Sequence, residues 1–245
     1  MNSCLLPFFL SVFYCRVVSL CVLSNSCRVV QKALEKLDEN DLPELLAEFH
    51  HSVLKCIHNQ HGNHVVQKWI EVMSAAAREA SHTGKHGQAE FLESQINFII
   101  DDVLGNVREL SCHTFGCRVL QRILEHCTEA KKTQLLDKLT PFHRELLDDQ
   151  FGNYVIQHVL EFGRHNDRES VMLIVIQQGI LRMSQQKYAS NVVEKLLKYG
   201  TPAQRNHLIR EMLRVSRLFV ECHVCTPVLP VVGNQERKKK PDPTY

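Results

Sequence analysis

The segment Asn153-Tyr-Val-Ile-Gln157 decides the fold, because close variants of it recur along the chain. We call this segment the pentad and number its positions 1 to 5. The other copies are Cys27-Arg-Val-Val-Gln31, Asn63-His-Val-Val-Gln67, Cys117-Arg-Val-Leu-Gln121 and Ser190-Asn-Val-Val-Glu194. Their starts lie 36, 54, 36 and 37 residues apart. A repeated unit of this size cannot bury its apolar faces alone, so the spacing predicts a stack of units.

Each unit has the pattern of helices. The pentad opens an apolar pattern with a period close to 3.6, which continues through segments such as His158-Val-Leu-Glu161. A turn and a second amphipathic stretch follow, for example over residues 130–139 and 203–215. No unit shows the strict alternation of apolar and polar residues that is typical of a strand. We therefore predict an all-α protein that forms an α-solenoid.

The 54-residue interval contains one unit and about 18 further residues. This surplus falls at about residues 75–91. It includes Ser81-His-Thr-Gly-Lys-His-Gly-Gln88, which is polar and contains two glycines. We therefore expect a loop inserted into the second unit.

The two ends depart from the repeat, so we divide the chain into an atypical segment 1–16, an array 17–217 and an atypical tail 218–245. Residues 5–23 are almost all apolar, which raises the alternative of a signal peptide or membrane anchor. No basic residue precedes them, and Arg16 would lie near the middle of a bilayer. We favour a buried helix at the end of the stack, or an atypical start of the coding sequence, and expect no membrane partner.

Composition narrows the class of protein. Of 245 residues, 44% are apolar and 23% charged, which suffices for a packed core. A net charge of +2 excludes a strongly basic, nonspecific nucleic-acid binder. Ten cysteines are normal for an intracellular chain, and we expect a cytoplasmic protein with reduced thiols. No second ligand pair accompanies Cys222-His-Val-Cys225, so we expect no metal and no cofactor. No catalytic constellation has consistent spacing, so we expect no enzyme.

The pentad has the chemistry to hold a nucleobase. On a helix, positions 1 and 5 share a face, positions 3 and 4 point into the core, and position 2 points toward a neighbouring unit. Positions 1, 2 and 5 are therefore expected to be exposed. Gln and Asn offer a donor and an acceptor to a base edge, and Glu offers acceptors only. Planar side chains at position 2 can stack on bases, which is worth about 1–3 kcal/mol each.

These segments resemble the RNA-binding domain of Pumilio-type PUF proteins, in which one repeat binds one base. The resemblance rests on segments 59–68, 115–127, 149–161 and 184–195, and it covers about residues 17–215. It implies a curved, right-handed solenoid of about five three-helix repeats, corresponding to repeats three to seven of eight. Val17-Val-Ser-Leu20 resembles the first helix of the first repeat. Asn25-Ser26 replaces the family's aromatic residue and glycine before the first pentad.

The family's rule assigns a base to each pair at positions 1 and 5, with the RNA antiparallel to the protein. Adenine falls to the pairs Cys27–Gln31 and Cys117–Gln121, uracil to Asn63–Gln67 and Asn153–Gln157, and guanine to Ser190–Glu194. The stacking positions are Arg28, His64, Arg118, Tyr154 and Asn191. The implied sequence is 5′-GUAUA-3′, the interior of UGUAUAUA.

The resemblance implies binding of single-stranded mRNA in 3′ untranslated regions, with repression of translation and mRNA stability. It also implies corepressors and a deadenylase complex on the convex face as protein partners, and it implies no DNA partner. Two alternatives stay open. The chain could be a protein-interaction scaffold of armadillo or HEAT type, or a truncated product that binds RNA weakly.

Overall fold

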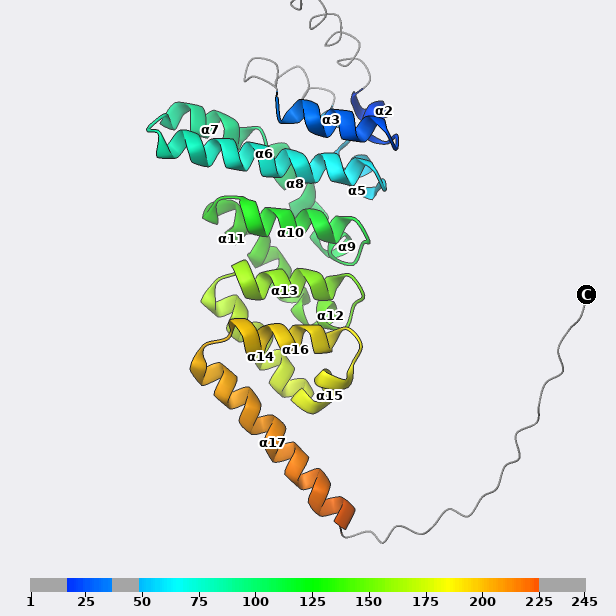
Figure 1. Cartoon of the computed structure of the whole chain (residues 1–245), viewed down its shortest axis with the longest axis vertical. Helices are drawn as coiled ribbons and strands as arrows, with labels where there is room; N and C mark the ends of the chain where they lie inside the picture. The colour runs from blue at the N-terminus through cyan, green and yellow to red at the C-terminus, as the bar shows by residue number, and fades with distance from the viewer. Residues whose placement is uncertain (1–16, 37–48, 225–245) are drawn as a thin grey trace, which may run out of the picture.

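The computed structural model describes residues 17–36 and 49–224, with only the backbone described over 215–224. Every regular element within those residues is a helix, which confirms the predicted all-α class (Figure 1). The pentads open five helices, which we call the pentad helices. These are α3 (Ser26–Leu34), α6 (Gly62–His82), α10 (Gly116–His126), α13 (Gly152–Phe162) and α16 (Ala189–Tyr199).

A short helix precedes each pentad helix and an outer helix follows most of them. The short helices are α2 (Val17–Cys21), α5 (Val53–His58), α9 (Val107–Ser111), α12 (His143–Leu147) and α15 (Ile180–Gln185). The outer helices are α8 (Asn97–Gly105), α11 (Glu129–Leu139), α14 (His165–Gln178) and α17 (Pro202–Val224). A 3₁₀ turn, η1 (Thr140–Phe142), connects α11 to α12. This succession is the helical repeat that the sequence predicts.

The pentad helices lie side by side in one layer, each in contact with the next along the chain (Figure 1). Their apolar positions 3 and 4 form the core between repeats. Val65, Val66, Val119 and Leu120 are fully buried, as are Val155 and Ile156. The expectation is wrong at Val29, which is 51% exposed. The reason is that α3 packs against a pentad helix on one side only within the described residues.

The expected loop at residues 75–91 is mostly helical instead. Helix α6 continues to His82, and α7 (His86–Ser94) folds back along it. Only residues 83–85 form the turn, where Gly84 has a φ of +77°. Ala77, Ala80, Ala89 and Leu92 are buried between the two helices. The alanine-rich stretch 75–80 favours helix, and its small side chains let α7 approach closely.

The predicted limits of the array differ from the helices at one end. Helix α17 continues to Val224, so the predicted boundary at residue 217 falls inside a helix. The segment 1–16 and the tail beyond 224, with Cys225, lie outside the described residues. Within the described residues, no helix is both long and apolar enough to span a bilayer.

Glycine immediately before position 1 allows the short helix to approach the pentad helix. A Cβ added at Gly62 would lie 2.7 Å from the carbonyl oxygen of Cys56, and one at Gly116 would lie 2.7 Å from that of Leu110. At Gly152 the nearest atom, Leu146 Cδ2, would be 2.8 Å away. These separations are below ordinary contact, so a side chain there forces the two helices apart.

Replacing Gly116 with alanine should therefore destabilise the protein, by about 1–3 kcal/mol, because overpacking costs that much in a tight core. Gly87 in α7 is the matched control, since no atom lies within 4 Å of a Cβ added there. Gly87→Ala should stabilise by about 0.5–1 kcal/mol through helix propensity. Urea unfolding followed by circular dichroism measures both, and equal effects would contradict the close approach.

A histidine is buried without partners at the start of α12. His143 is fully buried, and neither ring nitrogen has a hydrogen-bond partner. Burial lowers the pKa of His143 to about 4, although the nearby Asp167 carboxylate acts in the opposite direction. The ring is therefore neutral in the folded protein at neutral pH.

Because the pKa of His143 is lower in the folded than in the unfolded chain, protonation favours unfolding. Its contribution is complete above about pH 6.5 and is lost as the pH falls toward 4, a change of about 3 kcal/mol. Between pH 7.5 and 4.5, we expect wild type to lose unfolding free energy of that order relative to His143→Leu. A constant difference over this range would show that His143 does not titrate on unfolding.

Candidate nucleic-acid interface

The pentads align on the exposed surface of the pentad-helix layer, which we call the pentad face. Position 2 is exposed in the first four copies, Arg28, His64, Arg118 and Tyr154, and half-buried at Asn191. Position 5 is half-buried at Gln31, Gln67, Gln121 and Gln157, and exposed at Glu194. Position 1 departs from the expected exposure. Cys27, Asn63, Cys117 and Asn153 are buried, and only Ser190 is partly accessible.

Asn63 and Asn153 are buried because each closes the start of its own helix. Asn63 Nδ2 donates to the carbonyl oxygens of Asn59 and Gln60, both at 2.9 Å. Asn153 Nδ2 donates in the same way to Asp149 and Gln150, at 2.9 and 3.0 Å. Both hydrogens of each amide are therefore used, and the remaining side-chain atom, Oδ1, is an acceptor that faces position 5.

Glutamine at position 5 donates a hydrogen bond to Oδ1 of the asparagine at position 1. Gln67 Nε2 donates to Asn63 Oδ1 at 2.8 Å, and Gln157 Nε2 donates to Asn153 Oδ1 at 3.1 Å. The two pairs have the same geometry although they lie two repeats apart. In each pair one Gln Nε2 hydrogen and the Gln Oε1 are left for a ligand.

The cysteine pairs are different. Cys117 Sγ donates weakly to the Thr114 carbonyl oxygen at 3.7 Å, and burial raises the pKa of the Cys117 thiol to about 11. The thiol is therefore neutral at pH 7 and presents a small apolar surface. Gln121 has no hydrogen-bond partner among the described side chains, whereas Gln31 Nε2 donates to the Cys27 carbonyl oxygen at 3.2 Å.

The last pentad presents a carboxylate in place of an amide. Glu194 is exposed on α16, and the structure gives its side chain no hydrogen bond or ion pair among the described residues. Ser190 Oγ lies 3.5 Å from the Lys187 carbonyl oxygen, at the limit of a hydrogen bond. This end of the face therefore offers two acceptor oxygens without a hydrogen-bond donor in the described part of the chain, with Lys198 close enough to attract them electrostatically.

Position 2 side chains lie at the junctions between repeats. Asn191 Nδ2 approaches Asn153 Oδ1 of the preceding repeat at 3.5 Å. His64 neighbours Arg118 of the following repeat. Burial, with Arg118 and His61 nearby, lowers the pKa of His64, so that its ring is uncharged at neutral pH. Tyr154 is 49% exposed, so one face of its ring is open to a stacking partner. These flat groups alternate with the pairs at positions 1 and 5.

Sequence reasoning missed the residue four places before position 1, which caps the pentad helix. Asn59 Oδ1 accepts from the amides of His61 and Gly62, and Asp149 Oδ1 accepts from those of Phe151 and Gly152. His113 Nδ1 takes the same role for Phe115 and Gly116. Burial, with His58 nearby, lowers the pKa of His113 and keeps the accepting nitrogen unprotonated. Asn and Asp before a helix are familiar caps, so the signal was available in the sequence.

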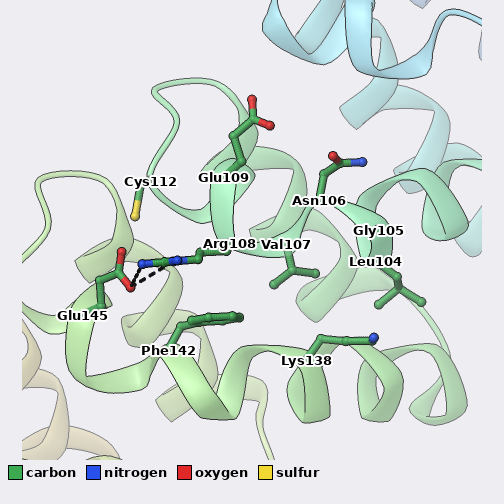
Figure 2. A pocket seen from close by; sticks show the side chains of 10 residues that line it. All are labelled: Leu104, Gly105, Asn106, Val107, Arg108, Glu109, Cys112, Lys138, Phe142 and Glu145. Carbon is green, nitrogen blue, oxygen red and sulfur yellow. Dashed lines mark hydrogen bonds and ion pairs between the residues drawn. The ribbon is translucent and has the colours of Figure 1, made fainter.

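A cavity of about 680 Å³ lies elsewhere, between the α8–α9 junction and α11 with α12 (Figure 2). The ion pair of Arg108 with Glu145, at 3.1 Å, crosses it, and the Arg108 guanidinium lies 5.6 Å from the Phe142 ring. No pentad residue lines the cavity. In the part of the chain that the structure describes, no three His, Cys, Asp or Glu side chains gather as metal ligands.

Known proteins with the same repeats match most of this chain. The profile of the Pumilio-family RNA binding repeat matches residues 16–50, 53–80, 106–140, 149–176 and 179–213. A Pumilio domain-containing protein of Schizosaccharomyces pombe is 26% identical over 83% of this chain and 38% of its own. Pumilio homolog 12 of Arabidopsis thaliana is 29% identical over 79% of this chain and 30% of its own. Residues 81–105, between the second and third matched segments, hold α7 of the insertion and the outer helix α8.

Solved structures agree with the fold. PUF-8 in complex with PBE-RNA superposes with a TM-score of 0.69 and 31% identity, over 82% of this chain and 54% of that one. The Puf3 RNA binding domain bound to a Cox17 RNA 3′ UTR recognition sequence gives 0.68 and 34%, over 82% and 53%. The chain thus spans about half of these domains, with the expected solenoid architecture. Because the repeat profile matches five segments and covers more than half of the residues, this chain belongs to the Pumilio family of RNA-binding repeat proteins.

Proposed function

We propose that the pentad face binds single-stranded RNA in a sequence-specific manner, one base per repeat. The observation that carries the proposal is the hydrogen-bond pattern shared by the pairs Asn63–Gln67 and Asn153–Gln157. A scaffold that only binds proteins has no reason to repeat such a pair beside flat side chains. The RNA complexes of PUF-8 and Puf3, which share this fold, support the same conclusion.

The asparagine pairs suit uracil. Because Asn Nδ2 is fully used by the backbone, Asn Oδ1 can only accept a hydrogen bond, and uracil N3–H is the donor available. Gln Nε2 then donates to a uracil carbonyl oxygen. Binding exchanges the internal Gln–Asn hydrogen bond for two to the base. Cytosine carries an unprotonated N3, which would face Asn Oδ1 with no proton between them.

The other pairs suit purines. Gln121 can accept from adenine N6–H and donate to adenine N1, while the neutral Cys117 thiol packs against the base edge. Glu194 can accept from guanine N1–H and N2–H together, a charge-assisted pair of hydrogen bonds. With the RNA antiparallel to the chain, as in the family, the preferred sequence is 5′-GUAUA-3′.

Affinity comes mainly from stacking at position 2. The rings of His64 and Tyr154 would each stack on a base, at about 1–3 kcal/mol. Arg28 and Arg118 would lay their guanidinium planes against bases, and Asn191 would place its planar amide at the fifth pentad. These contacts at five pentads would hold the RNA, and the proposed function is binding alone, with no chemical reaction.

We propose that the physiological targets are 3′ untranslated regions of mRNAs, whose translation and stability the protein represses in the cytoplasm. Corepressors and a deadenylase complex on the face opposite the RNA would complete this role.

A protein-interaction scaffold is the competing function. Its supporting observation is that the free pentads satisfy many of their own hydrogen bonds, as surface groups of a scaffold would. It predicts that exchanges at positions 1 and 5 leave RNA binding, if any, unchanged.

Exchanging the last pair should exchange the base it prefers. Wild type should bind labelled UGUAUAUA at least roughly tenfold more tightly than a copy with adenine in place of guanine, because an unmade hydrogen bond to a charged group costs about 1.5–3 kcal/mol. Ser190→Cys with Glu194→Gln recreates the pair found at Cys117 and Gln121 and should reverse this preference. Fluorescence anisotropy measures both. An unchanged ratio in the double variant would contradict guanine recognition by this pair.

Removing the two members of an asparagine pair should have separable effects. Gln157→Ala should leave thermal stability almost unchanged and reduce the discrimination between uracil and cytosine at the third base of UGUAUAUA. Asn153→Ala should also lower the unfolding free energy, by about 1 kcal/mol, because Asn153 closes the helix start. Thermal unfolding and anisotropy on the same samples test this. Equal loss of stability in both variants would contradict the assignment of helix closure to Asn153 alone.

A further inference from the structure

A second row of charged side chains runs beside the pentads across the repeats. Numbering onward from the pentad, position 6 is basic and position 9 is glutamate in the first four pentad helices. On a helix these positions lie close to positions 2 and 5 in direction, one turn or about 5.4 Å further along. The row therefore borders the pentad face directly. We call it the charge ladder.

The first three of the four glutamates in the charge ladder use their two oxygens differently. Glu35 Oε2 lies 2.6 Å from Lys32 Nζ of its own helix, while Oε1 lies 3.6 Å from Lys68 Nζ of the next. Glu71 Oε2 lies 3.0 Å from Lys68 Nζ, and Oε1 lies 3.8 Å from Arg122 Nη1. In each glutamate, Oε2 thus pairs with a cation of the same helix and Oε1 pairs with a cation of the next pentad helix.

The same arrangement continues at the next junction. Glu125 Oε2 lies 2.5 Å from Arg122 Nη1, and Oε1 lies 3.0 Å from His158 Nε2, an ion pair when that ring is protonated. Opposite charges thus alternate from α3 to Glu125 on α10, and a histidine contact continues the row to α13. The junction between α13 and α16 has its own pair, Glu161 Oε2 with Lys195 Nζ at 3.6 Å.

Isolated ion pairs on a surface stabilise proteins little. These side chains are different because, beyond Lys32, they are only 19–34% exposed and share partners in one network. A carboxylate held between two cations on adjacent helices restricts how far the helices separate and how they slide. Its main effect is therefore on geometry at the edge of the pentad face.

We propose that Glu35, Glu71 and Glu125 are positioning residues that hold adjacent pentads at a separation of one base. They touch no base themselves. Each acts through the basic residue of the following helix, one turn from the side chains that would bind and stack the bases. The inference rests on the proposed RNA binding and adds to it the element that fixes the spacing between successive sites.

RNAs with an extra nucleotide test the proposal. Insertion of one abasic nucleotide between the third and fourth bases of GUAUA places it at the junction of α6 and α10. Wild type should bind this RNA much more weakly than GUAUA. In Glu71→Gln the loss on insertion should be roughly two- to tenfold smaller, the range expected for coupled neighbours. Insertion between the first and second bases, at the junction of α13 and α16, should be penalised as in wild type.

Glu79→Gln is the matched control. It removes the same charge from the same helix, and Glu79 is exposed with no ion pair among the described residues. It should behave as wild type with every RNA. A loss of fold alone would weaken binding to all RNAs equally. An unchanged insertion penalty in Glu71→Gln, or an equal fall at both junctions, would overturn the proposal.

A measurement without RNA separates this proposal from the proposed function. Urea midpoints of Glu71→Gln, Arg122→Gln and the double variant should be non-additive, since the two side chains share one junction. If the shifts of the two single variants add up to the shift of the double variant, Glu71 and Arg122 are not coupled. The charge ladder then does not join the repeats, whatever the RNA result. If wild type fails to distinguish guanine from cytosine in UGUAUAUA, the proposed function fails and the spacing role falls with it, even when the midpoints are coupled.

Discussion

Stacking of the pentad helices against one another is the constraint on which the rest of the structure depends. No repeat can bury positions 3 and 4 alone, so Val119 and Leu120 are covered only because neighbouring helices lie on both sides. Once these positions point inward, helical geometry places positions 1, 2 and 5 in one row. The close approach of the short helix at Gly62, Gly116 and Gly152 fixes where each pentad helix begins. It therefore also fixes where each pentad lies along its helix.

Much of the fold was predictable because its signals are local and repeated. Pentad spacing identified the repeat, and apolar periodicity identified the helices. The sequence predicted a loop at the insertion because polar residues and Gly84 are typical of loops. The neighbouring alanines favour helix instead, and they pack α6 on α7. The exposure of Val29 could not be predicted, since it depends on which helices flank α3 rather than on the pentad itself.

The residues of the proposed site were named from the sequence, whereas their burial and hydrogen bonds were not. The sequence indicated which side chains lie on the same face of each helix. It did not indicate that Asn63 and Asn153 are buried, because their burial depends on hydrogen bonds to backbone carbonyl groups that are visible only in the structure. The charge ladder was visible as a basic residue at position 6 and glutamate at position 9. Its meaning depends on contacts between helices. One face therefore combines hydrogen bonds that close helix starts with ion pairs between repeats, and we propose that it also presents the base-binding groups.

We propose that RNA lies on this face antiparallel to the chain, with a register set by the order of the pentads. Placing 4-thiouridine at one uridine at a time in UGUAUAUA, crosslinking it and mapping the attached peptide tests this direction and register most directly. The third nucleotide should attach beside Tyr154 and the fifth beside His64. The reverse assignment, or attachment of both to the same peptide, would contradict one base per repeat in antiparallel order.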